Sequence, residues 1–332
     1  MPSKYHIYGM GNALVDIVTE VSDQFVQEHA IEKGVMTLVD EARQHQLVEA
    51  INLPSSDMQC GGSAANTIIG AAQFGASCYY SCKVANDKMG DFYCEDLTSN
   101  NVDTNLSPGH HEEGITGKCL VMTTPDAERT MHTYLGITAN YSNKEIAIEA
   151  LRESDYLYIE GYLVAGDHSR AAMIEAKQLA EQNDVKTALT FSDPSMVKYF
   201  RDQMAEVLGA GVDLLFCNEE EALLYTETAT IEKAQESLKC IAKSFVVTLG
   251  PKGALVFDGN NTYSIQPFET NAVDTNGAGD LFAGAFLYGI THGKSFQEAG
   301  TLASLAASKV VSKFGPRLSA EQASELHLQL FG

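Results

Sequence analysis

The chain has 332 residues, of which 45% are hydrophobic, enough for one large core with a small appended unit. Its 22 basic and 44 acidic residues give a formal net charge of −22, and no basic cluster exceeds a pair, which argues against nucleic-acid or anionic-membrane binding. Seven scattered cysteines, no apolar run of about 18 residues and no basic-then-apolar start predict a cytoplasmic protein without membrane span or secretory signal.

Strand-like and helix-like runs alternate along most of the chain. The predicted strands are residues 5–8, 79–84, 156–160, 187–192, 214–217 and 245–248. The predicted helices are residues 63–74, 91–99 and 167–182 and the last dozen residues. This alternation indicates a mostly parallel sheet covered by helices on both faces, with ligands at the carboxyl ends of its strands.

Two regions, residues 19–38 and 114–135, break this rhythm with alternating or β-branched stretches and short polar turns. They predict a small β-layer inserted in the first half of the chain, a lid; ordinary surface hairpins are the alternative. We therefore divide the chain into a large unit and a small β-lid. The large unit comprises residues 1–17, 39–112 and 137–332, and the lid comprises residues 18–38 and 113–136.

Polar residues follow the first predicted strand. The glycine pair at positions 9 and 11 is not a dinucleotide fingerprint, because Leu14 occupies the third glycine position. Asn12 and Asp16 lie just beyond the strand, and a carboxylate there can accept two hydrogen bonds from the vicinal hydroxyls of a sugar or ribose. The alternative is that these are turn or capping residues.

A second glycine-rich turn, Gly-Gly-Ser-Ala-Ala-Asn at residues 61–66, leads into the helix predicted for residues 63–74. Gly62 permits close backbone approach by a ligand, with Ser63 beside it, and Asn66 offers both a donor and an acceptor to a diol. Capping and turn formation are again the alternative.

Two polar segments follow later strands. Residues 218–221, Asn-Glu-Glu-Glu, come directly after the strand at 214–217 and are placed to organise Mg²⁺ through water. The alternative, compatible with the first, is a helix first turn with dipole-favoured glutamates. Residues 248–253, Thr-Leu-Gly-Pro-Lys-Gly, form a glycine turn suited to the border of a nucleotide site.

The most informative segment is Asp-Thr-Asn-Gly-Ala-Gly-Asp at residues 274–280, between a strand-like run at 263–273 and an apolar run with helical spacing. Glycines where a helix opens let backbone N–H groups converge on an anion, which the helix dipole also favours. Asp280 stands beside that anion, as suits a carboxylate that takes a proton from an attacking hydroxyl. The segment predicts a phosphotransferase centre; a merely dipole-complementing aspartate is the alternative.

These motifs, in this order across nearly the whole chain, resemble the ribokinase (PfkB) family of small-molecule kinases. Residues 274–280 match its C-terminal signature, residues 61–66 match its N-terminal one, and Asn218 with Glu221 resembles its Asn-x-x-Glu motif for Mg²⁺ and phosphate. The resemblance implies an α/β fold, a ribokinase-like αβα sandwich with a mostly parallel central sheet and a small inserted β-lid. It also implies ATP as the donor.

The resemblance further assigns roles to residues. Asp280 is the expected catalytic base, and Gly277, Ala278 and Gly279 are the expected anion hole. The residues expected beside the nucleotide are Asn218, Thr248, Gly250 and Gly253, with Glu221 holding Mg²⁺ through water. The region matching the family's site for a monovalent cation such as K⁺ is Asp274 and Thr275, with the late loop around Gly315 and Ser319.

Two details are similar to nucleoside kinases of the adenosine kinase type. Residues 11–17 resemble that branch's opening, and Ser63 stands where ribokinases commonly place a lysine, which leaves room beside a larger aglycone. Arg129 matches a lid arginine that reaches the transferring phosphate on closure. The turn at residues 63–66, Ser-Ala-Ala-Asn, is closer to sugar kinases.

We therefore expect an ATP- and Mg²⁺-dependent kinase that phosphorylates the primary 5′-hydroxyl of a ribonucleoside, with adenosine, converted to AMP, as first choice. The residues expected to hold the ribose are Asn12, Asp16, Gly62, Ser63 and Asn66. One alternative is a carbohydrate kinase acting on ribose, fructose or a related sugar. Another is a non-catalytic sensor of such molecules. The chain is expected to act as a monomer or homodimer.

Overall fold

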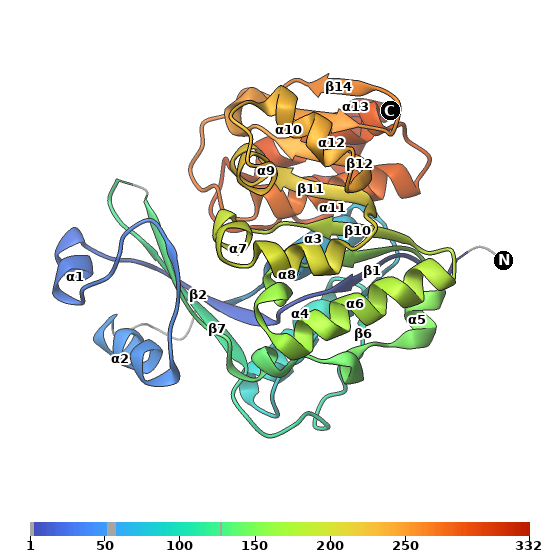
Figure 1. Ribbon diagram of the computed structural model, residues 1–332. Coiled ribbons are helices and arrows are strands. Elements are labelled where there is room, and N and C mark those ends of the chain that lie inside the picture. The colour runs from blue at the N-terminus through green and yellow to red at the C-terminus, as the bar shows by residue number, and fades with distance from the viewer. Residues whose placement is uncertain (1–2, 52–57, 127) are drawn as a thin grey trace.

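The computed structural model describes residues 3–51, 58–126 and 128–332 and contains two β-sheets. In Figure 1 the larger sheet lies between two layers of helices, and the smaller sheet projects to one side with α1 (Asp23–Glu28) and α2 (Glu41–Ile51). No helix in the described ranges is long and apolar enough to cross a membrane.

The larger sheet has nine strands in the order β14-β13-β12-β11-β10-β9-β1-β5-β6. All neighbours from β12 to β6 pair in parallel, and only β13 and β14 are antiparallel, which confirms the mostly parallel sheet. The strands are β1 (Tyr5–Met10), β5 (Cys78–Ser81), β6 (Val102–Thr104), β9 (Ser154–Ile159), β10 (Lys186–Thr190), β11 (Val212–Asn218), β12 (Ala242–Thr248), β13 (Ala254–Phe257) and β14 (Thr262–Ile265).

Each face of this sheet has its own hydrophobic core. The helices over one face are α3 (Ser63–Phe74), α4 (Lys88–Ser99), α11 (Ala278–Thr291), α12 (Phe296–Val310) and α13 (Ala320–Phe331). The helices over the other face are α5 (Ile148–Arg152), α6 (Asp167–Gln182), α7 (Pro194–Tyr199), α8 (Arg201–Leu208), α9 (Glu219–Thr226) and α10 (Ile231–Leu238). Short 3₁₀ turns are η1 (Gly136–Asn140), η2 (Asn143–Glu145), η3 (Gly161–Ala165) and η4 (Gly250–Lys252).

The close packing of α3 against α11 matters most for function. A Cβ at Gly284 of α11 would collide with the backbone carbonyl of Thr67 in α3, so only glycine allows this approach. The contact brings the first turns of the two helices together, and those turns carry Ser63 and Asp280.

The smaller sheet has five strands in the order β3-β8-β7-β2-β4. They are β2 (Leu14–Glu20), β3 (Met36–Leu38), β4 (Met58–Gly61), β7 (Gly117–Thr123) and β8 (Arg129–Tyr134). One face packs with α1 and α2 on a small core that includes Val26, Leu47 and Leu120. The sequence therefore predicted a second β-layer correctly, and the structure shows it as a sheet with its own core.

The membership of this sheet differs from the predicted division of the chain. Residues 39–112 were assigned to the large unit, whereas β4 pairs antiparallel with β2, and α2 donates a hydrogen bond from Gln44 to the Lys118 carbonyl of β7. β2 also begins at Leu14, inside the predicted range 1–17. Three strands of the small sheet, β2, β3 and β4, precede α3, and β3 and β4 are too short to show a pattern. That each sheet is the core of a separate domain stays a proposal.

The segment before residues 274–280 is also different. The run at 263–273 was predicted as strand-like, but β14 ends at Ile265. The following loop is instead held to the end of α12, because Val273 and Asp274 donate backbone hydrogen bonds to the Val311 carbonyl at 2.7 and 3.1 Å.

Candidate active site

A cavity of ≈ 580 Å³ lies where the carboxyl edge of the larger sheet meets the smaller sheet. Its floor comes from the ends of strands such as β11 and β12 and from the first turns of α3 and α11, and its roof comes from β2, β3, β7 and β8. Among the predicted site residues, those that line it are Asn12, Asp16, Gly62, Ser63, Asn66, Asn218, Glu221, Thr248, Thr275, Gly277, Ala278, Gly279 and Asp280. Segments more than 200 residues apart in the sequence thus meet at one place.

Gly277 is the N-cap of α11 and takes the left-handed conformation, with φ 70° and ψ 4°. A side chain here would be strained by that φ and would also collide with Pro316. Gly279, in contrast, has open space where a Cβ would stand. The two glycines therefore differ in kind: Gly277 shapes the turn, and Gly279 leaves the mouth of the helix clear.

Asp280 follows in the first turn of α11 and lines the cavity. Its carboxylate accepts hydrogen bonds from Ser63 Oγ at 2.7 Å and from Asn66 Nδ2 at 3.2 Å. Burial raises the pKa of Asp280 to about 6, although these two bonds and the positive charge of Arg317 act in the opposite direction. At neutral pH the group is ionised yet more basic than an ordinary aspartate.

The glycine turn at Gly61 and Gly62 passes beside Asp16 of the smaller sheet. Asp16 is buried on β2, and a Cβ at Gly61 would collide with its carboxylate. Gly62 has φ 96°, and a Cβ there would strike the Asn12 carbonyl. Both glycines are therefore required for the turn to pass so close to Asn12 and Asp16.

Glu160, which the sequence did not single out, holds Asn12 in place. It is fully buried at the end of β9 and accepts from the Asn12 backbone N–H at 2.7 Å, from Asn12 Nδ2 at 2.9 Å and from the Ala64 N–H at 3.0 Å. Burial raises the pKa of Glu160 to about 7 against the effect of these bonds. The available signal was an acidic residue closing an apolar strand, which is weak when read alone.

Asn218 and Glu221 form a capping box at the start of α9. Asn218 Oδ1 accepts from the Glu221 N–H at 2.8 Å, and Glu221 accepts in return from the Asn218 N–H and side-chain amide. The helix first-turn interpretation is thus confirmed. Both side chains also line the cavity, and burial raises the pKa of Glu221 to about 7.

These residues fit Mg²⁺ held through water rather than directly. Among the described residues, no group of three or more His, Cys, Asp or Glu side chains could hold a metal ion. Glu221 nevertheless presents a buried carboxylate to the cavity, where a hydrated cation would satisfy its charge. The magnesium role of Glu221 stays a prediction.

The predicted nucleotide turn is divided between two roles. Asn218, Thr248 and Gly250 line a shallow groove that continues from the cavity over α9. Gly253 has φ 94°, and a Cβ there would collide with the Ile265 carbonyl, so it allows the backbone to turn back beside β14. Gly253 is not among the residues described as lining the cavity or the groove.

Asp274 meets the late loop, as the resemblance implied. It is buried and accepts from the backbone N–H groups of Asn276 at 2.7 Å and Gly315 at 3.0 Å. Thr275 lines the cavity. Ser319 instead caps α13 by accepting from the Gln322 N–H at 3.1 Å. The monovalent-cation role of this region stays a prediction.

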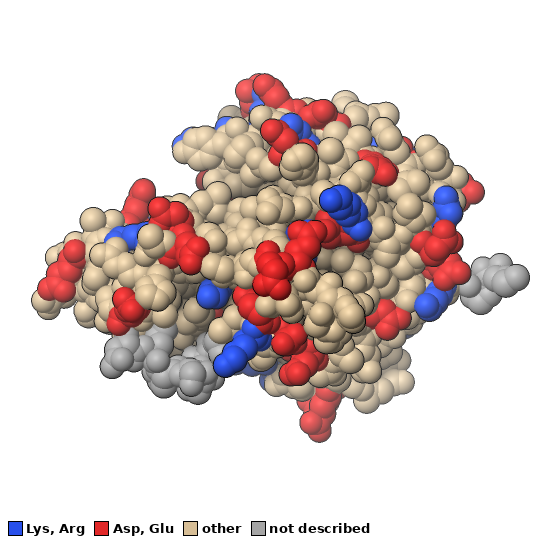
Figure 2. Space-filling view, turned by 90° about the horizontal axis from the view of Figure 1, so that it is seen from below, with Lys and Arg blue, Asp and Glu red and all other residues tan. Residues whose placement is uncertain are grey.

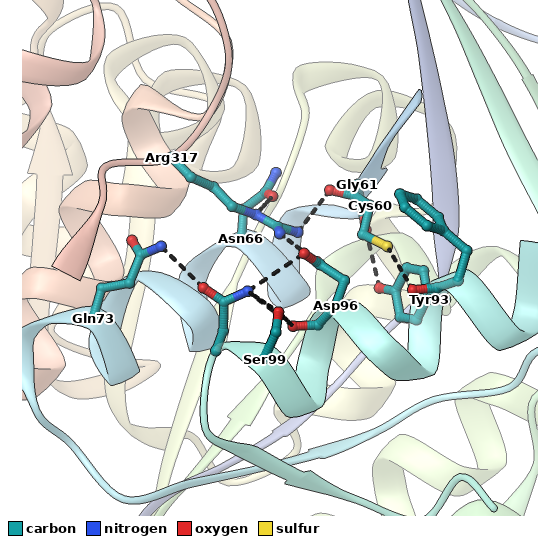
Figure 3. Close-up of polar contacts among 10 residues, drawn as sticks. Cys60, Gly61, Asn66, Gln73, Tyr93, Asp96, Ser99 and Arg317 are labelled. Carbon is teal, nitrogen blue, oxygen red and sulfur yellow. Dashed lines mark hydrogen bonds and ion pairs between the residues drawn. The ribbon is translucent and has the colours of Figure 1, made fainter. Parts of the chain in front are cut away.

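Two arginines are relevant to this site, Arg129 by the sequence resemblance and Arg317 by its contacts in the fold. Arg129 is the first residue of β8, and its side chain lies outside the described part of the structure, so its expected role stays a prediction. Arg317, which the sequence did not single out, donates to Asn66 Oδ1 at 2.9 Å (Figure 3), and Asn66 lines the cavity. No motif marks Arg317, because its partners come from distant elements.

Comparison with known proteins gives consistent results. A family model described as pfkB family carbohydrate kinase matches residues 33–323. The adenosine kinase of Saccharomyces cerevisiae is 27% identical over 340 residues, covering 95% of this chain and 97% of that protein.

Two solved structures are similar over nearly the whole chain. The probable sugar kinase of Rhizobium etli CFN 42 superposes with a TM-score of 0.91 at 31% identity, covering 98% of each chain. The adenosine kinase of Sinorhizobium meliloti superposes with a TM-score of 0.89 at 34% identity, covering 97% of this chain and 99% of that one. These likenesses confirm the predicted ribokinase-like α/β fold.

Proposed function

The chain belongs to the pfkB family of carbohydrate kinases, and from that premise we propose that it transfers the γ-phosphoryl group of ATP to the 5′-hydroxyl of a ribonucleoside, with adenosine as first choice. Its membership and its relatives make it a phosphotransferase that acts on hydroxyl groups. What the proposal adds is the identity of the acceptor.

The observation that carries the choice of a nucleoside is the unequal polarity of the cavity. Most of the side chains that the smaller sheet presents to the cavity are apolar, namely Leu14, Met36, Leu38, Cys119, Val121 and Met131, and Leu135 follows directly after β8; Asp16 and Thr133 are polar. The floor presents Asn12 and Asp280, and the Asp16 carboxylate of β2 lies against the Gly61-Gly62 turn beside them. A free sugar carries hydroxyl groups all round and would leave some of them against the apolar roof without partners. A nucleoside has a polar ribose for the floor and a flat, largely apolar base for the roof.

We assign the ribose to these polar groups. Asp16 is a buried carboxylate at the cavity wall, and a carboxylate accepts from two vicinal hydroxyls at once. Gly62 lets the backbone stand close to the same hydroxyls. Asn66 accepts from Arg317 and donates to Asp280, which leaves its second amide hydrogen and the second lone pair of Oδ1 for the ribose.

The chemistry follows from Asp280. Its carboxylate takes the proton of the 5′-hydroxyl as that oxygen bonds to the γ-phosphorus, and the bond from γ-phosphorus to the bridging oxygen breaks to release ADP. The backbone from Gly277 to Gly279 at the N-terminus of α11 offsets the charge on the transferring group. Mg²⁺, when bound, neutralises phosphate charge, and Glu221 is the residue that would orient its water ligands.

A carbohydrate kinase is the second candidate, favoured by two observations. The helix opening Ser63-Ala64-Ala65-Asn66 is closer to sugar kinases, and a probable sugar kinase superposes with a TM-score of 0.91. Ribose and fructose are its test substrates.

A substrate panel with coupled detection of ADP separates these candidates. We expect kcat/KM to be highest for adenosine and lower for other nucleosides, ribose and fructose. 5′-Deoxyadenosine, which lacks the attacking hydroxyl, should inhibit competitively without being phosphorylated. Faster turnover of a free sugar would overturn the nucleoside assignment, and an absence of substrate-dependent ATP consumption would leave only the sensor.

A further inference from the structure

Arg317 makes three hydrogen bonds to three different elements. It lies in the loop between α12 and α13, and its guanidinium donates from Nε to Asn66 Oδ1 at 2.9 Å, from Nη1 to Asp96 Oδ2 at 2.6 Å and from Nη2 to the Cys60 carbonyl at 2.6 Å. Figure 3 shows the guanidinium at the centre of these acceptors, which come from α3, α4 and β4. Each nitrogen of the planar fork is used.

The surroundings hold this fork in one position. The side chains of Arg317 and Asp96 are only 15% and 24% exposed, so their ion pair is shielded from solvent more than a surface pair. Asp96 is itself placed by Asn100, whose side-chain amide donates to it. A planar fork with three fixed acceptors has little freedom to rotate.

The bond to Asn66 decides which way the Asn66 amide points. A guanidinium only donates, so the Asn66 atom facing it must be the oxygen. The Nδ2 group then faces Asp280, and an ionised carboxylate only accepts, so the same orientation satisfies both ends. With Arg317 removed, only the Asp280 carboxylate still orients the amide, so the Asn66 side chain is held at one end instead of at both.

The bond to Cys60 fixes the other side of the site. Cys60 lies in β4, immediately before the Gly61-Gly62 turn that passes beside Asp16. One side chain thus sets the position of the turn and of Asn66 together. Asn66 lines the cavity and Arg317 stands behind it, so Arg317 acts without touching substrate.

We infer that Arg317 is a positioning residue for phosphoryl transfer: it fixes the Asn66 amide so that this amide holds the Asp280 carboxylate in place, and it anchors the turn that precedes α3. This inference rests on the proposed role of Asp280 as the base.

The first test compares Arg317→Met with Arg152→Met, a control that removes a cation from α5, where Arg152 pairs with Glu149 at 3.0 Å. We expect kcat with saturating adenosine and ATP to fall about 10²-fold in Arg317→Met, the loss typical of a misplaced reacting group. The KM for ATP should not change, and Arg152→Met should match the wild type. An unchanged kcat in folded Arg317→Met would overturn the inference.

Arg317→Lys keeps the positive charge and serves as a second variant in case Arg317→Met does not fold. One ammonium cannot reproduce a planar fork, so kcat should still fall while the thermal midpoint stays near that of the wild type. Full activity in Arg317→Lys would overturn the inference. In the Arg317→Met/Asn66→Ala double variant, the two losses should be less than multiplicative, because Arg317 acts through Asn66. Losses that multiply would show independent roles and would also overturn it.

A readout without turnover separates this inference from the proposed function. The ionisable groups around Asp280 are Arg317 from the late loop, Tyr158 and Glu160 at the end of β9, and Tyr162 in η3. Because the charge of Arg317 favours the ionised form of Asp280, removing Arg317 should raise the pH at which Asp280 titrates. This titration is measured by ¹³C NMR of protein with labelled aspartate, and the Asp280→Asn variant assigns the signal. Arg152→Met should titrate like the wild type, and Arg317→Lys, which keeps the charge but not the fork that orients Asn66, should move the titration less than Arg317→Met does. An unmoved titration in Arg317→Met would overturn the inference even if no panel substrate is phosphorylated, whereas an inactive wild type would overturn only the proposed function.

Discussion

At the scale of single residues, Asp280 has to meet two conflicting demands if it is the base that we propose. It must be ionised to accept a proton, yet basic enough to attract one, and efficiency is greatest when its pKa lies near the working pH. Burial raises its pKa to about 6, while Ser63 and Asn66 keep the ionised form accessible by donating hydrogen bonds to it. Burial and these two hydrogen bonds together thus determine the pKa of the Asp280 carboxylate.

Replacement of Asp280 by asparagine tests its role as base. Asparagine keeps the size of the side chain and removes the proton acceptor, so we expect kcat to fall on the order of 10³-fold. ATP binding, measured by calorimetry, should persist. Asp202→Asn, at an exposed aspartate of α8, is the matched control and should turn over normally. Near-normal turnover in Asp280→Asn would remove Asp280 as the base.

The pH dependence of kcat should report the same carboxylate. Because the pKa of Asp280 is raised, the group becomes protonated and inactive as the pH falls through about 6, whereas an ordinary aspartate would stay ionised to about pH 4. Ser63→Ala removes a bond to the ionised form and should shift the acidic limb to higher pH. The limb should be missing from the residual activity of Asp280→Asn; if it persists there, another group such as Glu160 is responsible.

Sequence reasoning found Asp280 but missed Arg317, for a physical reason. Residues 274–280 carry their chemistry in one continuous stretch, so glycines, helix start and carboxylate are visible together. Arg317 and Glu160 act through partners that only the fold brings near, such as Asn66 and the Asn12 amide. Such a residue has no local pattern and is recognised only when its hydrogen bonds are seen.

At the scale of elements, helices with clear boundaries were the most predictable. α3 begins after Gly62 and ends before Gly75, which has φ 112°, and its bounds match the prediction, as do those of α6. The small sheet was predicted less well, because β3 and β4 are short and their partners are distant in sequence. Strand pairing of that kind is set by tertiary contacts, which local periodicity does not report.

The opening of α11 offers a matched pair of glycines. Gly277→Ala would place a Cβ at φ 70° and against Pro316, so we expect a loss of about 1–3 kcal/mol in the free energy of unfolding. Gly279→Ala has open space for its Cβ and should unfold at the wild-type midpoint, while its methyl group obstructs the phosphate and lowers kcat. Thermal unfolding and turnover measured on both variants check this, and an equal loss of stability in the two would contradict it.

At the scale of the whole molecule, the net negative charge requires any attraction for phosphate to come from groups close to the binding site. The chain carries a net charge of −22, and Figure 2 shows acidic side chains spread over the visible face with basic side chains scattered among them. Such a surface repels a nucleotide at long range. Under the proposed function, the attraction for phosphate would come from the N-terminus of α11 and from Mg²⁺, inside a cavity that two sheets enclose.

Because both sheets line the cavity, we expect the smaller sheet to move relative to the larger one and to become less mobile when ligand binds. The cavity is lined by both sheets, so a bound nucleoside and a non-hydrolysable ATP analogue should draw the smaller sheet onto the larger and slow amide hydrogen exchange in β7 and β8. β13 and β14, at the far edge of the larger sheet, serve as the internal control and should exchange at an unchanged rate. Asp280→Asn should show the same protection, because it loses the proton acceptor and not the ligand contacts of the roof. Exchange in β7 and β8 that ignores saturating ligand would mean that the smaller sheet is a fixed wall, and the apolar roof would then select the base by shape alone.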